Sequence, residues 1–202
     1  MLPPKAGGIG EPKKAARRSA RLARRVIDRR ARRLKRIAYL AGLLGLDHRS
    51  IPADKGQRIH ALRAEAVSGR IELDDLLRVL LKLAKRRGYK GSFKVRKEQD
   101  EGVVEPGINH LKQQMSDANC TTLGQYLAKR FEAGETLKLK EAGLYSHRDM
   151  LEDEFNAIWV EQVNHHPILA ESRPDPLDKD KRSRLIRDQF FDAIFYQRPL
   201  KS

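Results

Sequence analysis

The stretch KKAARRSARLARRVIDRRARRLKRIAYLAGLL, residues 13–44, decides how the chain folds. Pro12 stands directly before it and suits the start of a helix, where the missing N–H of a proline costs no hydrogen bond. The stretch contains no proline, and the only glycines up to Leu46, Gly42 and Gly45, lie near its end. We therefore predict one helix over residues 13–46, about 45–50 Å long at ~1.5 Å per residue.

The two halves of this predicted helix differ in their chemistry. The first half carries arginines around most of its circumference and leaves only a thin apolar seam. The second half carries enough apolar side chains to pack on a core, so we expect an anchored strut rather than a free tail. The seam comprises Leu22, Val26, Ile27 and Leu34, and the packing stripe comprises Leu34, Ile37, Tyr39, Leu40, Leu43 and Leu44.

The charge of the chain is concentrated in the same helix. Residues 13–36 hold ten arginines, three lysines and one acid, Asp28, which is +12 of the formal net charge of +15. A solvated helix face would alternate the two signs, because like charges four residues apart destabilise a helix. A disordered basic tail or a nuclear-localisation segment is an alternative, although the apolar stripe favours a packed helix. Since arginine matches phosphate with two parallel donors, the composition predicts binding to RNA phosphates.

Shorter helices make up the rest of the predicted fold. Apolar residues recur at helical spacing and the two-residue alternation of strands is almost absent, so we predict an all-α protein. Predicted helices cover 58–67, 73–87, 105–117, 122–133, 148–165 and 179–196. Predicted loops cover 47–57, 89–104 and 134–147, the last with a weak hairpin as the alternative. The predicted organisation is a linker at 1–12, the Arg-rich helix at 13–46 and a helical domain at 47–202.

A second basic cluster closes the helix predicted at 73–87. The ordinary explanation is compensation of the helix dipole, with Gly88 as the C-terminal cap. The alternative is a phosphate clamp in which an aromatic side chain stacks on a base or a sugar. Composition alone leaves both open. The cluster comprises Lys82, Lys85, Arg86, Arg87, Tyr89 and Lys90.

No catalytic, cofactor or metal site is predicted within the chain. A Gly-rich phosphate loop, a nucleophile elbow and a His/Cys/Asp constellation are all missing from the sequence. His165 and His166 would point about 100° apart on a helix, and no third ligand stands at metal-binding spacing. The acids at residues 149 and 152–154 are interpreted as a solvated first helical turn rather than a magnesium site. Trp159 and its apolar neighbours are interpreted as core.

The compartment and the extent of the protein are also predicted from the sequence. Cys120 is the single cysteine and fits a reducing compartment. No run of roughly 18 apolar residues is present, so we expect no membrane span. The start of the chain lacks the apolar core of a signal peptide, and both ends lack helix caps. We therefore interpret the chain as a piece of a longer protein.

Four stretches of the sequence are distinctive when taken together. The first is RRARRLKRIAYL at residues 29–40. The second joins LRAEA at 62–66 to LLKLAKRRGYK at 80–90. The third is TLGQYL at 122–127, followed by Phe155 and Trp159, and the fourth is IFYQRPLKS at 194–202.

Together these stretches resemble the type II CRISPR-associated RNA-guided DNA endonucleases, most of all the compact II-C branch. The first resembles the bridge helix of that family, and the second is similar to its LRAEAL … LLHLAKRRGYKS signature. The fourth is similar to the IFFQRPLKS stretch that closes the recognition lobe.

The resemblance implies a non-catalytic piece of a larger nuclease. In the family, this region holds the bridge helix and the first part of the α-helical recognition lobe. The HNH and RuvC-like catalytic residues, and the Mg²⁺ that they use, would lie outside it. The implied partners are guide RNA and the target DNA paired with it, in antiviral defence in the prokaryotic cytoplasm. Asp28 and Ile27 stand where relatives often carry basic residues, so one or two phosphate contacts are expected to be missing.

The RNA-contacting residues are carried over from the resemblance one by one. Contacts to guide-RNA phosphates are implied for seven arginines of the Arg-rich helix: Arg21, Arg24, Arg25, Arg29, Arg32, Arg33 and Arg36. A second contact to RNA is implied for residues of the LLKLAKRRGYK match: Lys85, Arg86, Arg87 and Tyr89.

Two other functions remain open on the sequence. The basic helix could be an interaction surface for an acidic anti-CRISPR inhibitor protein, since opposite charge promotes such association. The chain could also be an unrelated helical RNA-binding protein, such as a ribosome-associated factor, but that interpretation leaves the QRPLKS ending unexplained.

Overall fold

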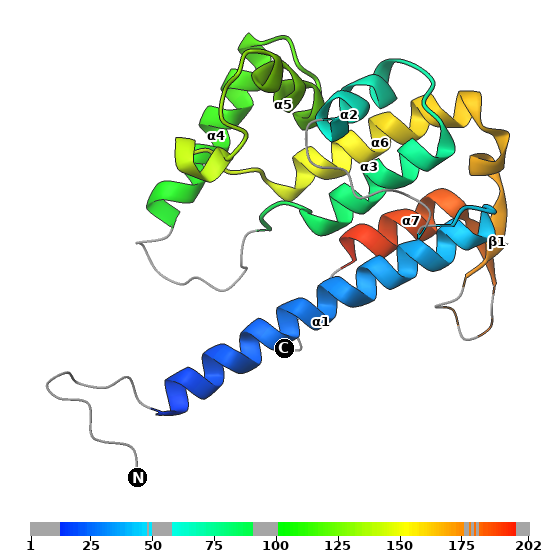
Figure 1. Ribbon diagram of the computed structural model, residues 1–202, viewed down its shortest axis with the longest axis horizontal. Coiled ribbons are helices and arrows are strands. Elements are labelled where there is room, and N and C mark those ends of the chain that lie inside the picture. The colour runs from blue at the N-terminus through cyan, green and yellow to red at the C-terminus, as the bar shows by residue number, and fades with distance from the viewer. Residues whose placement is uncertain are drawn as a thin grey trace, which may run out of the picture.

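The computed structural model describes residues 13–47, 49, 58–90, 101–175, 178, 180 and 182–196. These residues form a mainly helical protein, as predicted, with one small sheet in addition (Figure 1). The helices are α1 Lys13–Leu43, α2 Arg58–Ser68, α3 Leu73–Lys85, α4 Glu101–Asp117, α5 Leu123–Glu132, α6 Arg148–His165 and α7 Ile186–Phe195. Two 3-10 helices, η1 Leu139–Ala142 and η2 Pro167–Ala170, and two strands, β1 Ser172–Pro174 and β2 Ser183–Leu185, complete the described structure.

Helix α1 is anchored by its C-terminal half alone. Ile37, Leu40 and Ala41 are buried where α1 packs against α3 and α7. The N-terminal half extends past these two helices (Figure 1). The helix ends at Leu43 because Gly45 adopts a positive φ of 75°, and the N–H of Leu46 donates to the carbonyl of Ala41 at 3.0 Å. The strut predicted over 13–46 is thus confirmed to within three residues.

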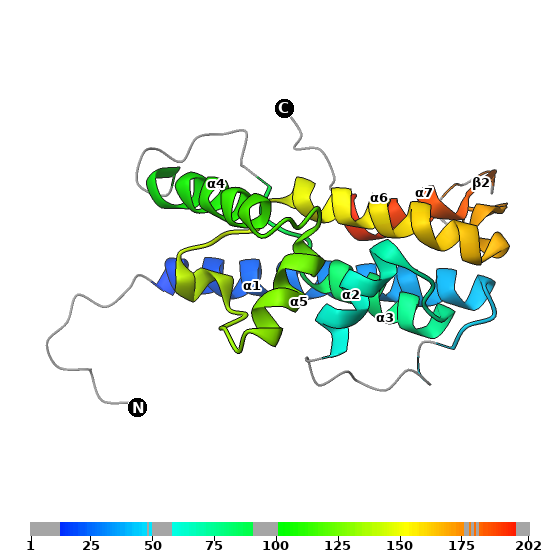
Figure 2. The ribbon, with the colours of Figure 1, turned by 90° about the horizontal axis from the view of Figure 1, so that it is seen from above.

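Helix α6 is the centre of the core. Its residues Phe155, Ile158 and Trp159 are almost completely buried, as expected for core residues. The ring of Phe155 stacks on Trp159 with centroids 5.3 Å apart, and Phe190 of α7 lies 5.6 Å from Trp159. In both views α7 runs beside α1 (Figures 1 and 2). The aromatic contacts therefore join α7, which supports α1, to the centre of the protein.

One buried ion pair joins α2, α5 and α6. The guanidinium of Arg63 makes two hydrogen bonds to Glu154, at 2.6 and 2.7 Å, and both side chains are almost fully buried. The N–H of Gly124 donates to the same carboxylate at 2.9 Å. A Cβ at position 124 would lie 2.7 Å from the Cβ of Arg63, so only glycine allows this approach. Such a pair fixes the relative placement of three helices because each partner, left alone, would be a buried charge.

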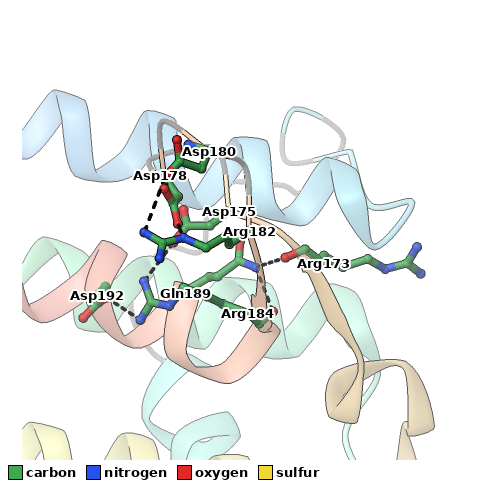
Figure 3. Close-up of polar contacts among 8 residues, drawn as sticks. All are labelled: Arg173, Asp175, Asp178, Asp180, Arg182, Arg184, Gln189 and Asp192. Atoms are coloured by element: carbon green, nitrogen blue, oxygen red, sulfur yellow. Dashed lines mark hydrogen bonds and ion pairs between the residues drawn. The ribbon is translucent and has the colours of Figure 1, made fainter.

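A small antiparallel hairpin, β1–β2, precedes α7 and is the main feature that the sequence did not predict. Arg184 of β2 holds it in place, with hydrogen bonds of 2.8 Å to Asp175 and to Asp192 of α7 (Figure 3). The amide of Gln189 adds bonds to the carbonyls of Arg173 and Arg184 (Figure 3). The helix predicted over 179–196 is wrong at its start, because α7 begins only at residue 186.

The other predicted bounds are mostly close to those observed. Helix α6 has the predicted limits, and α2, α3 and α5 agree within two residues. Helix α4 begins at Glu101 with Pro106 inside it, so the loop predicted over 89–104 is wrong for its last four residues. Residues 134–147 contain η1 instead of a hairpin. The predictions made for residues 1–12, 50–57, 91–100 and 197–202, including the QRPLKS ending, lie outside the described residues.

The structure also bears on the histidine pair at 165–166 and on membrane-spanning helices. His166 is buried, and its Nε2 lies 2.7 Å from the carbonyl oxygen of Ile71, whereas His165 pairs with Glu161 on the surface. The two histidines therefore have separate structural partners. Within the described part of the chain, no helix is both long enough and apolar enough to cross a membrane.

Candidate nucleic-acid interface

The arginines in the N-terminal half of α1 face solvent. The carried-over residues Arg21, Arg24, Arg25, Arg29 and Arg32 are all exposed, while Arg33 and Arg36 are half-buried near the body of the protein. The apolar seam is exposed too, with Leu22, Val26 and Ile27 at 54%, 64% and 66%. Leu34 alone of that seam packs against the core. This half of α1 therefore offers a charged surface that the rest of the described chain does not cover.

Among the described residues, none of these arginines forms an ion pair with a carboxylate. The ion pairs of those residues lie outside α1, such as Arg58 with Asp75 and Arg182 with Asp178. On α1, Arg21 donates only to the backbone carbonyl of Arg17, at 3.3 Å. A row of guanidinium groups without carboxylates is an unfavourable arrangement unless an anion is bound.

The body of the protein adds two arginines to the row, beside the end of α3 and the start of α6. Arg33 of α1 donates its Nε–H to the carbonyl of Ala84, at 3.3 Å, in the last turn of α3. Arg87 follows α3 and donates to the carbonyl of Tyr196 at 3.2 Å. Arg148 is the first residue of α6 and is buried. Three guanidinium groups from separate parts of the chain thus gather in one cluster, the Arg33–Arg87–Arg148 cluster.

A short backbone contact brings Arg87 and Arg148 together. The N–H of Tyr89 donates to Ser146 at 2.8 Å, and the N–H of Arg148 donates to Tyr89 at 2.7 Å. Gly88 lies inside this contact with φ of 76°. A Cβ there would stand 2.7 Å from the carbonyl oxygen of His147 and 2.8 Å from the Cα of Arg148. Glycine is therefore required at position 88 both for its conformation and for the close approach.

The pKa values of all three arginines in the cluster are lowered, and burial is the largest cause in each case. Burial lowers the pKa of Arg87 to about 10, and the nearby charges of Arg33, Arg148 and Arg29 act in the same direction. Burial, then Arg148 and Arg30, lower the pKa of Arg33. Burial also lowers the pKa of Arg148, while Glu152 and Asp149 act in the opposite direction. At neutral pH these arginines stay protonated, so the cluster concentrates positive charge that a phosphate group would neutralise.

The residues of the second predicted site, Lys85, Arg86, Arg87 and Tyr89, do not all lie on one surface. Arg87 faces the cluster, whereas Arg86 and Tyr89 line a cavity on another side of the α3 terminus. Lys85 is exposed. The simple capping explanation is wrong in its details, because the helix ends at Lys85 and the backbone N–H of Arg86 closes its last turn. Gly88 lies beyond that cap and serves the contact with residues 146–148 instead.

Arg148 was missed by the sequence analysis, although a signal was present. A basic residue in the first turn of a helix opposes the helix dipole, so arginine is an unfavourable choice there. Its position beside a row of arginines is a tertiary feature, produced by the contact between Tyr89 and residues 146–148.

Comparison with known proteins gives related sequences and folds. No family model matches the chain. The CRISPR-associated endonuclease Cas9 of Campylobacter jejuni is 30% identical over 133 residues, which is 60% of this chain and 13% of that protein. The chain therefore spans only a small part of this curated relative.

Solved structures extend the similarity to most of the chain. Campylobacter jejuni Cas9 in complex with sgRNA and target DNA matches with TM-scores of 0.67 and 0.69, at 24% and 22% identity. These matches cover 92% and 96% of this chain, and 25% and 26% of that one. An St1Cas9 assembly with sgRNA, tDNA20 and AcrIIA6 matches at a TM-score of 0.67 and 16% identity, over 96% of this chain and 22% of its own. The chain is therefore related to the type II CRISPR-associated endonuclease Cas9, in sequence over 133 residues and in fold over most of its length.

Proposed function

We propose that this chain is the guide-RNA-binding part of an RNA-guided DNA endonuclease and has no nuclease activity of its own. In this proposal α1 is the bridge helix and residues 47–202 belong to the recognition lobe. The RNA phosphates lie along the exposed arginines of α1 and reach the Arg33–Arg87–Arg148 cluster. Target DNA joins the complex as the strand paired with the guide, in the prokaryotic cytoplasm where the parent enzyme acts.

The observation that carries the proposal is the row of arginines without acidic partners, continued by two more from the body. An isolated helix with this charge is unfavourable, and an A-form backbone supplies regularly spaced negative charge to neutralise it. The solved Campylobacter jejuni Cas9 structures of the same fold contain sgRNA and target DNA, which supports the same ligand class here.

Catalysis is assigned to parts of the parent outside this chain. Among the described residues, no three His, Cys, Asp or Glu side chains gather to hold a metal ion, so we derive no Mg²⁺-dependent step for them. The expected result is that the chain does not cleave an RNA–DNA heteroduplex or duplex DNA in the presence of Mg²⁺. DNA cleavage that survives purification to homogeneity would contradict this assignment.

The test of RNA binding is a salt titration with a heteroduplex of about 20 base pairs, which this class of protein recognises by its backbone. The variant combines Arg24→Ala, Arg29→Ala and Arg32→Ala. The slope of log affinity against log salt should fall by about one unit for each lost phosphate contact. The matched control removes Arg58, Arg70 and Arg182, which lie outside α1 and are paired with carboxylates.

The two triple variants lose the same formal charge, so the comparison separates position from net charge. We expect weaker binding only in the α1 variant. Equal binding by the α1 variant and the wild type would remove these arginines from the interface.

An acidic inhibitor protein is the second candidate ligand of the same surface. The α1 row is exposed, and a solved St1Cas9 assembly of this fold contains AcrIIA6. In this alternative an acidic protein takes the place of RNA phosphates on α1. Competition distinguishes the two uses, because a protein bound to α1 should be displaced by the heteroduplex, and the Arg24, Arg29 and Arg32 substitutions should weaken both.

A further inference from the structure

A cavity of about 1100 Å³ lies beside the α3 terminus, between α2, α3, α5 and residues 137–146. Its floor is apolar, with Leu83, Leu144 and Leu151 among the buried side chains that form it. The aromatic rings of Phe131 and Tyr89 also line it and remain 37% and 46% exposed. Because its volume slightly exceeds the roughly 300–1,000 Å³ typical of ligand sites, this cavity has room for a nucleotide.

The charge around the cavity selects an anionic occupant. Arg86 and Lys140 line it, and neither forms an ion pair with another described residue. Lys138 is paired with Glu141 at 2.9 Å, and Arg63 forms its ion pair with Glu154. The lining therefore combines flat apolar surfaces with a cationic edge, which is the combination that single-stranded nucleic acid uses for its bases and phosphates.

Consecutive residues at the α3 terminus connect the cavity to the proposed RNA surface. Arg86, Gly88 and Tyr89 line it, while Arg87 between them belongs to the Arg33–Arg87–Arg148 cluster. Successive side chains at the α3 terminus thus serve two neighbouring surfaces. An RNA backbone held at the cluster would pass the entrance of the cavity, so a base leaving its stack there meets Phe131 and the leucines.

We propose that the cavity binds one nucleotide extruded from the RNA, with its base against Phe131 and the apolar floor and its phosphates near Arg86 and Lys140. This inference rests on the proposed function, because the arginine cluster must hold the RNA first. It adds to that function a site that distinguishes an interrupted RNA duplex from a continuous one.

The test compares two end-labelled RNA duplexes that differ only in a central 2-aminopurine, which is either paired or present as a single-nucleotide bulge. Binding is measured by anisotropy, and the accessibility of the 2-aminopurine by acrylamide quenching. We expect the bulged duplex to bind roughly tenfold more tightly, since stacking of one base on an aromatic side chain supplies a gain of this order. Its 2-aminopurine should become protected from acrylamide in the complex.

The variants are Phe131→Ala and Lys140→Glu, with Lys129→Glu as the control. Phe131 is outside the buried core, so its truncation should leave the fold intact, which thermal unfolding verifies. Lys129 is an exposed lysine of α5 that does not line the cavity, and its reversal changes the net charge by the same amount as Lys140→Glu. Phe131→Ala and Lys140→Glu should abolish the preference for the bulge, while Lys129→Glu should keep it.

The outcomes separate this inference from the function on which it rests. Equal affinity for the two duplexes, with both bound, overturns the nucleotide site and leaves the RNA-binding function standing. Failure to bind either duplex overturns both. An acidic leucine-rich peptide that binds in a Phe131-dependent way, while the bulged 2-aminopurine stays open to quenching, would show that the cavity takes a protein segment and would also overturn the nucleotide site.

Discussion

Individual arginines lower the stability of the RNA-free protein, and a bound anion would relieve this destabilisation. Arg87 is the clearest case, because burial and three neighbouring guanidinium groups lower its pKa to about 10. Its pKa lies below the unfolded value, so its charged form destabilises the folded protein at neutral pH. The corresponding stability would be recovered only as the pH rises above about 10.

The first prediction concerns Arg87→Gln. Removing one of the repelling charges outweighs the single hydrogen bond to Tyr196, so the melting temperature of the RNA-free protein should rise, by about 2 °C for a chain of this size. RNA affinity should fall at the same time. Differential scanning fluorimetry with sulfate or chloride at equal ionic strength provides the check, because sulfate should stabilise the wild type more than the variant. A lower melting temperature with an unchanged sulfate effect would contradict the prediction.

At the scale of elements, the contact between the α3 terminus and the start of α6 assembles the arginine cluster. Gly88 makes that contact possible, and two backbone hydrogen bonds of 2.7 and 2.8 Å hold it. Gly134 has a similar φ of 72° but nothing within 4 Å of the position its Cβ would take. The two glycines therefore differ in one respect, the closeness of the neighbouring backbone.

The second prediction compares Gly88→Ala with Gly134→Ala. Both substitutions should cost about 1–2 kcal/mol from the left-handed conformation, and only Gly88→Ala adds a steric clash with residues 147–148. Gly88→Ala should therefore lower the free energy of unfolding by more, in urea titrations, and should also weaken heteroduplex binding. Equal stability and equal binding of the two variants would show that the contact does not position Arg87 and Arg148.

Some helices and strands could be predicted from the sequence more accurately than others. Helices with a strong apolar repeat, such as α3 and α6, were predicted almost to the residue, because one buried face determines them locally. The β1–β2 hairpin was missed because its strands have three residues each and are held by Arg184, whose partner Asp192 lies on α7. Helix α4 was predicted too short, since it begins at Glu101 and continues through Pro106, a residue that usually interrupts a helix.

In the candidate site too, features local to the sequence could be predicted, whereas features that depend on the fold could not. The α1 arginines could be predicted since composition reveals them. The family resemblance implied an RNA contact for Arg87 but did not give its position beside α1. Arg148 could not be predicted, because it joins Arg33 and Arg87 only through the fold. The cavity beside Phe131 could not be predicted either, since its walls come from four separate segments of the chain.

At the scale of the whole molecule, stability is unevenly distributed along α1. Its C-terminal half is packed on α3 and α7, whereas its N-terminal half is exposed and carries arginines four residues apart at 17, 21, 25, 29 and 33. Such spacing destabilises a helix, and a short unsupported helix is marginal in water. The folded body and the projecting half should therefore open independently.

The third prediction is a gradient of amide exchange along α1. Without RNA, the amides of residues 17–32 should exchange within seconds, while those of residues 37–43 should be protected with the core. Heteroduplex binding should extend the protection into residues 17–32, as hydrogen exchange with mass spectrometry would detect, and circular dichroism should show added helix. Uniform protection along α1 in the free protein would contradict the predicted fraying.

The one-sided anchoring of α1 also has a mechanical consequence. With Ile37, Leu40 and Ala41 fixed in the core, the projecting half acts as a lever with its fulcrum near Leu34, where packing begins. Its arm from residue 17 to residue 34 is about 25 Å long at ~1.5 Å per residue. Tilting the arm by about 10° moves its tip by roughly 4 Å. A pull on the outer arginines is thus transmitted as torque to α3 and α7, which hold the other end.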